Sequence, residues 1–131
     1  MIDNIAIDLP QFNVYSNSIG SLTHYCETHQ SSVPTEFEIE KLLPYARQTD
    51  FILKTFHEII DDLNYDKEKF ENIIYTFDDD YDILEEFISK LNPSLKSHNE
   101  LLKISNKILI NLIKAQNELG IIVSQHDNTR I

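Results

Sequence analysis

The sequence predicts an all-α fold, a compact bundle of four to six helices with an extended or short-strand N-terminal arm. Two glycines and four prolines in 131 residues are too few turn signals for many short strands. Apolar residues recur at steps of three and four over long stretches. The length suits one domain with a sizeable core, so we take residues 1–131 as a single helical domain.

The arm is expected over residues 1–17. Ile5, Ile7 and Leu9 alternate with other residues, a period of two that fits a short strand, and a second short alternation follows Pro10. We expect an extended arm packed on the helices, with a small hairpin as the alternative.

The first helix is expected over residues 18–30, where Ser18 can cap it and Ile19, Leu22, Cys26 and His29 recur at helical steps. Residues 31–34 then form a linker.

The next helix begins with a capping box, in which the Thr35 hydroxyl and the Glu38 carboxylate accept each other's backbone N–H. Pro44 lacks the N–H that a helix interior needs. We therefore expect a short helix near 36–43 and a second helix with Pro44 in its first turn. A single kinked helix is the alternative.

A helix over residues 67–91, capped by Asp66, has the strictest pattern in the chain. Its apolar residues advance by four and three, a heptad seam held for three repeats. The seam consists of Phe70, Ile74, Phe77, Tyr81, Leu84, Ile88 and Leu91. Aspartate is a poor helix-interior residue, so a break at Asp78 is the alternative.

The last helix is the most apolar and is expected to be central. Ser97 and Glu100 resemble a second capping box, and Gly120 suits the left-handed position after the last turn. Residues 124–131 are expected to be a loose tail.

Negative charge is concentrated in residues 36–86, where sixteen Asp or Glu face five Lys or Arg, a balance of −11. Residues 89–117 carry +4, from five lysines and Glu100. Such a field attracts cationic partners and repels nucleic acid and anionic membranes, so we expect no direct nucleic-acid binding and no membrane binding.

Cys26 is the only cysteine, which excludes an intramolecular disulfide and fits a reducing compartment. The N-terminus lacks the positive charge and the apolar run of a signal peptide, and no stretch is long and apolar enough for a membrane span. We expect a soluble cytoplasmic protein.

Three groups of residues resemble metal sites, and each fails. Asp78, Asp80 and Asp82 are spaced as in a calcium loop, but Ile83 and Ser89 stand where glycine and glutamate are needed. Residues 57–61 resemble a zinc-protease signature, with an aspartate where the second histidine belongs. Residues 24–29 offer two histidines and Cys26, which do not converge on a helix. We expect no metal.

Catalytic motifs are also absent from the sequence. It has no nucleophile elbow and no glycine-rich phosphate loop. We therefore expect neither an enzyme nor a cofactor.

The acidic surface is the remaining candidate site. Carboxylates crowd the side of helix 67–91 away from the seam, around a tyrosine, which is a favoured interface anchor. Crowded aspartates oppose helix propensity, a local conflict often tolerated where a site needs it. The expected partner-binding residues are Asp61, Asp62, Glu71, Tyr75, Asp78, Asp79, Asp82, Glu85 and Glu86.

In its size, acidity and helical pattern the chain resembles bacterial immunity proteins, which neutralise basic nuclease toxins by covering their substrate-binding surface. That resemblance implies a small acidic inhibitor of a basic protein partner, a toxin or nuclease. One alternative is a scaffold subunit, a helical homodimer formed through the Phe70–Leu91 seam. The other is a DNA mimic that inhibits a defence enzyme.

Overall fold

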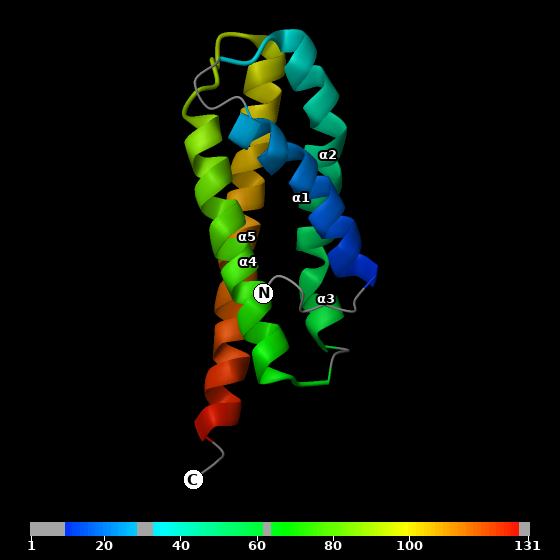
Figure 1. The fold of residues 1–131 in the computed structure, drawn as a ribbon, viewed down its shortest axis with the longest axis vertical. Helices are drawn as coiled ribbons and strands as arrows, with labels where there is room; N and C mark the ends of the chain where they lie inside the picture. The colour runs from blue at the N-terminus through cyan, green and yellow to red at the C-terminus, as the bar shows by residue number, and fades with distance from the viewer. Residues whose placement is uncertain (1–9, 29–32, 62–63, 129–131) are drawn as a thin grey trace.

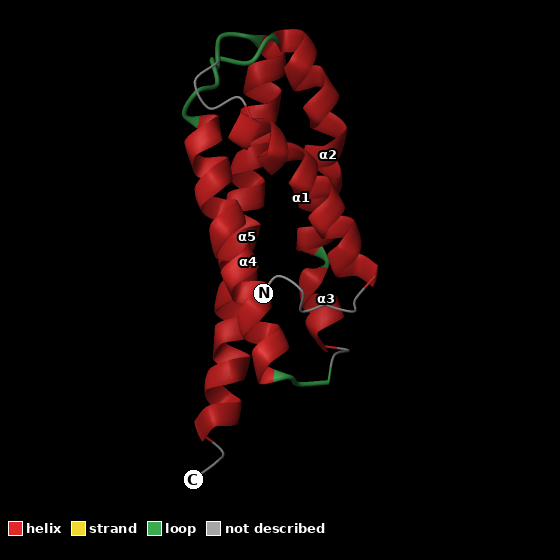
Figure 2. Cartoon of the chain, in the orientation of Figure 1, coloured by secondary structure: helices red, strands yellow, loops and turns green. Residues whose placement is uncertain are grey.

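A computed structural model describes residues 10–28, 33–61 and 64–128 of the chain, and within them every regular element is an α-helix (Figures 1 and 2). This confirms the all-α fold. The helices are α1 (Pro10–Thr28), α2 (Glu36–Lys54), α3 (Phe56–Asp61), α4 (Lys67–Ile88) and α5 (Lys96–Asn128).

The helices form a four-helix bundle, in which the short α3 follows α2 in the same column (Figure 1). The main contacts join α2 to α5, α4 to α5, α1 to α2 and α1 to α4. The helices α2 and α4 therefore occupy opposite corners, as do α1 and α5. The outward sides of α2 and α4 face away from each other.

One hydrophobic core runs through the bundle. At its centre the rings of Tyr15, Phe56 and Phe77 are almost completely buried. The Phe77 ring lies 5.1 Å from Tyr15 and 5.2 Å from Phe56, both in edge-on geometry. Aromatic pairs of this kind add about 1 kcal/mol each to the burial of their area. Because these rings come from α1, α3 and α4, they join the columns of the bundle.

Polar side chains link the columns at their edges. Arg47 on α2 forms an ion pair with Glu100 on α5, at 2.9 Å. Asp50, which is buried, accepts a hydrogen bond from Asn111 of α5 and pairs with Lys54. The buried Asp50 carboxylate is thus neutralised and hydrogen-bonded, as burial of a charge requires.

The prediction of an arm over residues 1–17 and of a helix from residue 18 is wrong from Pro10 onward, because α1 begins there. Residues 1–9 lie outside the described part of the chain. Phe12 and Tyr15 are buried and extend the three-and-four spacing of Ile19 backward, whereas Val14 is 40% exposed. The short alternation at Phe12 and Val14 is therefore the start of a helical stripe.

The chain does not break at Pro44, so the prediction of two helices there is wrong and the single-helix alternative is closer. Pro44 lies on the exposed side of α2, where water can satisfy the carbonyl group that loses its helical donor. The break comes instead at Thr55, whose hydroxyl bonds to the Ile52 carbonyl oxygen at 3.1 Å. The capping box of Thr35 and Glu38 is confirmed.

The helix α4 runs unbroken through Asp78, Asp79 and Asp80, which confirms one helix rather than two. Asp66 caps it by accepting the backbone N–H of Lys69 at 3.1 Å. The predicted seam needs one correction. Its alternate positions 74, 81 and 88 are only partly buried, and the buried stripe of α4 runs through positions 70, 73, 77, 84 and 87. The predicted end at residue 91 is also wrong, because α4 ends at Ile88 and the buried Leu91 follows it.

The predicted ends of the last helix are both wrong. Ser97 is buried inside the first turn of α5 and is not its cap. The preceding loop is held instead by Asn92, whose backbone N–H donates to Nδ1 of the buried His98 at 3.0 Å. At the other end the helix passes through Gly120, which has no positive φ, and continues to Asn128.

The residues predicted as a loose tail are helical as far as Asn128 because two contacts hold the last turns. Lys67 pairs with Asp127 at 3.3 Å. The rings of Tyr65 and His126 stack in parallel, 3.7 Å apart. Both contacts come from residues at the start of α4, so the end of α5 is tied to the connection that precedes α4.

Substitution of Gly120 tests whether α5 is continuous at this position. A Cβ built at Gly120 meets nothing within 4 Å, and glycine is unfavourable in a helix interior. We expect Gly120→Ala to stabilise the protein by about 0.5–1 kcal/mol, measured by urea denaturation. A loss of stability would contradict the continuous helix, because a left-handed Gly120 would not accept a side chain.

Candidate protein-binding face on α4

The candidate site is the outward side of α4. The core stripe fixes the rotation of this helix, so the side opposite that stripe faces solvent. Six of the expected site residues are exposed and a seventh, Glu71, is partly exposed. We call the following set the acidic α4 face: Glu71, Tyr75, Asp78, Asp79, Asp82, Glu85 and Glu86.

The other two expected residues are not placed on this face. Asp61 is the last residue of α3, and its side chain lies outside the described part of the structure. Asp62 lies entirely outside it. The site therefore rests on α4 alone.

No ion pair between described residues joins the acidic α4 face to the lysines of α5. The ion pairs between described residues join Arg47 to Glu100, Lys54 to Asp50 and Lys67 to Asp127. Within those residues, neither the acidic α4 face nor Lys103, Lys107 and Lys114 of α5 takes part in one. Among the described residues, the acidic α4 face therefore keeps its negative charge without an ion pair.

Asp80 differs from its neighbours because it faces inward. It occupies the core stripe three residues after Phe77 and four before Leu84, a spacing that was visible in the sequence. Tyr15, fully buried on α1, donates a hydrogen bond from its hydroxyl to Asp80 Oδ2 at 2.7 Å. This pair satisfies two polar groups inside the bundle and links α1 to α4.

The pKa of Asp80 is raised to about 6, mainly by burial. The Tyr15 hydrogen bond opposes this rise, and the nearby carboxylates of Asp79 and Glu27 add to it. Burial, followed by the charge of Asp80, raises the pKa of Tyr15 well above its ordinary value. Tyr15 therefore stays protonated and remains the donor in this pair.

Tyr75 stands at the edge of a groove between α4 and α5. Its side chain is 65% exposed. The groove, of about 440 Å³, is lined by Glu71, Ile74, Tyr75, Gly120, Val123, Ser124 and Asp127. An apolar or cationic side chain of a partner fits such a recess.

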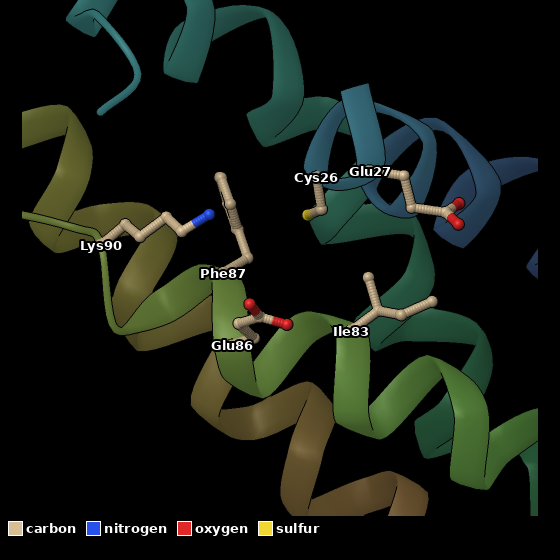
Figure 3. Close-up of a pocket in the computed structure, with 6 residues that line it drawn as sticks. All are labelled: Cys26, Glu27, Ile83, Glu86, Phe87 and Lys90. Atoms are coloured by element: carbon tan, nitrogen blue, oxygen red, sulfur yellow. The ribbon is translucent and has the colours of Figure 1, made fainter. Parts of the chain in front are cut away.

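A second cavity, of about 100 Å³, lies between α1 and α4 around Cys26. The Cys26 sulfur points into the gap between the helices, whereas the Glu27 carboxylate points away from it (Figure 3). Burial raises the pKa of the Cys26 thiol to about 12, although Lys90 opposes the effect. The thiol is therefore protonated and inert as a nucleophile at neutral pH.

The metal-like motifs of the sequence do not form a site in the described residues. No group of three or more His, Cys, Asp or Glu among them lies close enough to hold a metal ion. His29 and the His57 side chain lie outside those residues. Asp78 and Asp82 point to solvent while Asp80 points to Tyr15, so the calcium-loop positions diverge.

The seam expected to pair with a second copy is used within the chain. Phe70, Phe77, Leu84 and Leu91 are between 0% and 7% exposed, packed against the other helices of the same bundle. A scaffold dimer through this seam would require the bundle to open.

None of the described helices has the length and apolar character needed to cross a membrane. Comparisons with protein-family models, with curated proteins and with solved structures give no match.

The Asp80 carboxylate predicts a specific pH dependence. Its folded pKa, about 6, lies above the ordinary value of 3.8. The stability that this group contributes is present below pH 3.8 and is lost as the pH rises through 6. We expect Asp80→Asn, which keeps the acceptor for Tyr15, to stabilise the protein by about 2 kcal/mol at pH 8 and little at pH 4.

Urea denaturation of both proteins at the two pH values measures this difference. Asp79→Asn, a neighbouring exposed position, removes the same charge and is expected to show a much smaller pH-dependent gain. Equal gains from the two substitutions would mean that Asp80 is not buried in the folded protein.

Proposed function

We propose that this protein binds and neutralises a basic protein partner through the acidic α4 face, and that it is an immunity protein against a nuclease-type toxin. The observation that carries the proposal is the row of exposed carboxylates along one helix, without ion pairs to other described residues. Nucleases carry basic surfaces because their substrate is a polyanion. A rigid acidic helix complements such a surface.

The position of the carboxylates supports rapid capture. They project from a helix whose rotation is fixed by the core, so little ordering is needed when a partner binds. Residues 78–86 span about 12 Å along the helix axis, enough to meet several basic side chains at once. Long-range attraction of this kind raises the association rate more than it raises affinity.

Tyr75 supplies an apolar contact within the same face. Its ring is exposed among Glu71, Asp78 and Asp79 and borders the groove between α4 and α5. A tyrosine of this kind buries a large area at a low entropic cost. In the proposed complex the carboxylates steer the partner and Tyr75 slows its release.

The first test is capture of the partner from a lysate of the source organism, with identification by mass spectrometry. The neighbouring reading frame offers an independent candidate, and a toxin gene there would support the proposal. The purified partner is then used for kinetics and for a nuclease assay. A DNA mimic shares these electrostatics, and competition with duplex DNA for the same target would favour that alternative.

Charge reversal on the acidic α4 face is expected to slow capture. We expect Asp79→Lys with Asp82→Lys to lower the association rate by at least about tenfold at low salt, because the steering field is weakened. Stopped-flow measurements over a series of salt concentrations should also show a steep fall in the unmodified protein's association rate.

The matched control makes the same charge change on the opposite helix, with Glu36→Lys and Glu40→Lys on α2. This variant should retain most of the association rate. Unchanged kinetics in the α4 double variant would remove the acidic α4 face as the binding site.

Tyr75 is expected to affect mainly the rate at which the partner dissociates. We expect Tyr75→Ala to raise the dissociation rate by about 10- to 100-fold, with little change in the association rate. Surface plasmon resonance with the purified partner measures both rates. Tyr45→Ala, at an exposed tyrosine of α2, is the control and should leave both rates unchanged.

A further inference from the structure

The outward side of α2 carries an aromatic stripe that the fold does not use. Phe37 and Phe51 are 66% and 68% exposed, and Pro44 between them is exposed as well. The three residues are spaced by seven, so they fall within about 40° of one another around the helix. We call Phe37, Pro44 and Phe51 the α2 stripe.

This stripe is unusual for a surface. Single exposed apolar side chains are common, but Phe37 and Phe51 are two large exposed rings on the same face of one helix. Lys41 covers one side of the first ring, with Nζ 4.3 Å from the Phe37 centroid. The buried side of α2 is formed by other residues, which include Ile39, Leu42 and Ala46.

We propose that the α2 stripe binds the same stripe of a second copy of the chain, with the two α2 helices antiparallel about a twofold axis at Pro44. Phe37 and Phe51 each lie seven residues from Pro44. Antiparallel pairing about Pro44 therefore places Phe37 of each copy against Phe51 of the other, and the stripe is its own complement.

The charged residues beside the α2 stripe are arranged to fit the same twofold axis. Glu40 and Arg47 lie on one flank of α2, on either side of Pro44. The twofold axis brings Glu40 of one copy opposite Arg47 of the other, twice in the dimer. Arg47 is held at this flank by Glu100, at 2.9 Å, while half of its side chain remains exposed.

Two other exposed surfaces are less able to pair with a second copy of themselves. The acidic α4 face repels its own copy, since like charges meet across any twofold axis near its centre. On α5 the exposed Ile110 and Ile113 are flanked by Lys107 and Lys114, which again meet like charges. On α2, by contrast, the exposed Glu36 and Glu40 balance Lys41 and Arg47.

The contact is small, so the dimer is weak. Four phenylalanine rings supply on the order of 500 Å² of buried area, and a stable interface buries about 1,200 Å² or more. We expect a micromolar dissociation constant. Each chain carries a net charge of −11, so added salt should tighten the dimer by screening repulsion. Capture of a basic partner has the opposite salt dependence.

Sedimentation equilibrium of the full chain, from about 10 µM to 1 mM, tests the dimer. We expect Phe37→Ser and Phe51→Ser each to raise the dissociation constant at least about tenfold. Ile113→Ser, at an exposed isoleucine of α5, should leave it unchanged. Far-UV circular dichroism verifies that each variant is folded, as expected for substitutions at exposed positions.

Oxidative cross-linking tests the position of the axis. Pro44→Cys should form a disulfide-linked dimer rapidly, because the two thiols meet at the axis, while Cys26 is buried. Asn106→Cys on α5 is the exposed control and should cross-link slowly. A chain that is monomeric at 1 mM, a dimer insensitive to both phenylalanine substitutions, or equal cross-linking of the two cysteine variants would each overturn the proposal.

Discussion

Phe77 lies where α1, α3 and α4 meet, and its ring contacts Phe12, Tyr15 and Phe56. Because a helix is rigid about its axis, fixing this one side chain fixes the direction of every other residue of α4. The residues that follow Phe77 must turn outward, outward and then inward, which is how Asp78, Asp79 and Asp80 are placed. The acidic surface is thus a consequence of core packing.

The sequence was sufficient for the features that rest on local periodicity. The continuity of α4, its Asp66 cap and the capping box of Thr35 and Glu38 all follow from residues close in the chain. The exposure of Asp78 and Asp79 on the outer side of α4 could also be predicted from the heptad pattern.

Features that depend on distant partners could not be predicted in the same way. The helix α5 continues past Gly120 because Lys67 and Tyr65 hold its last turns, and neither contact is visible in the local sequence. The hydrogen bond of Asp80 to Tyr15 could not be predicted, because the two residues are 65 positions apart in the chain. The exposed aromatic side of α2 could not be predicted, because in the sequence Phe37 and Phe51 resemble core residues.

The bundle separates two kinds of surface. Carboxylates crowd α4, where mutual repulsion opposes folding, and the core stripe of the same helix supplies the compensating burial. Exposed aromatic side chains collect on α2, at the opposite corner, where the charges are nearly balanced. The two helices share no extensive contact, so the two surfaces are separate.

The contacts at the end of α5 have a consequence for how the protein opens. Tyr65 and Lys67 bracket the Asp66 cap of α4, and both also hold the last turns of α5 through His126 and Asp127. Fraying of one helix end therefore releases the other, and the two behave as a single cooperative unit. Loss of the final residues of α5 would remove the contacts of Tyr65 and Lys67 with His126 and Asp127, and would thereby loosen the first turn of α4, the helix that carries the acidic residues.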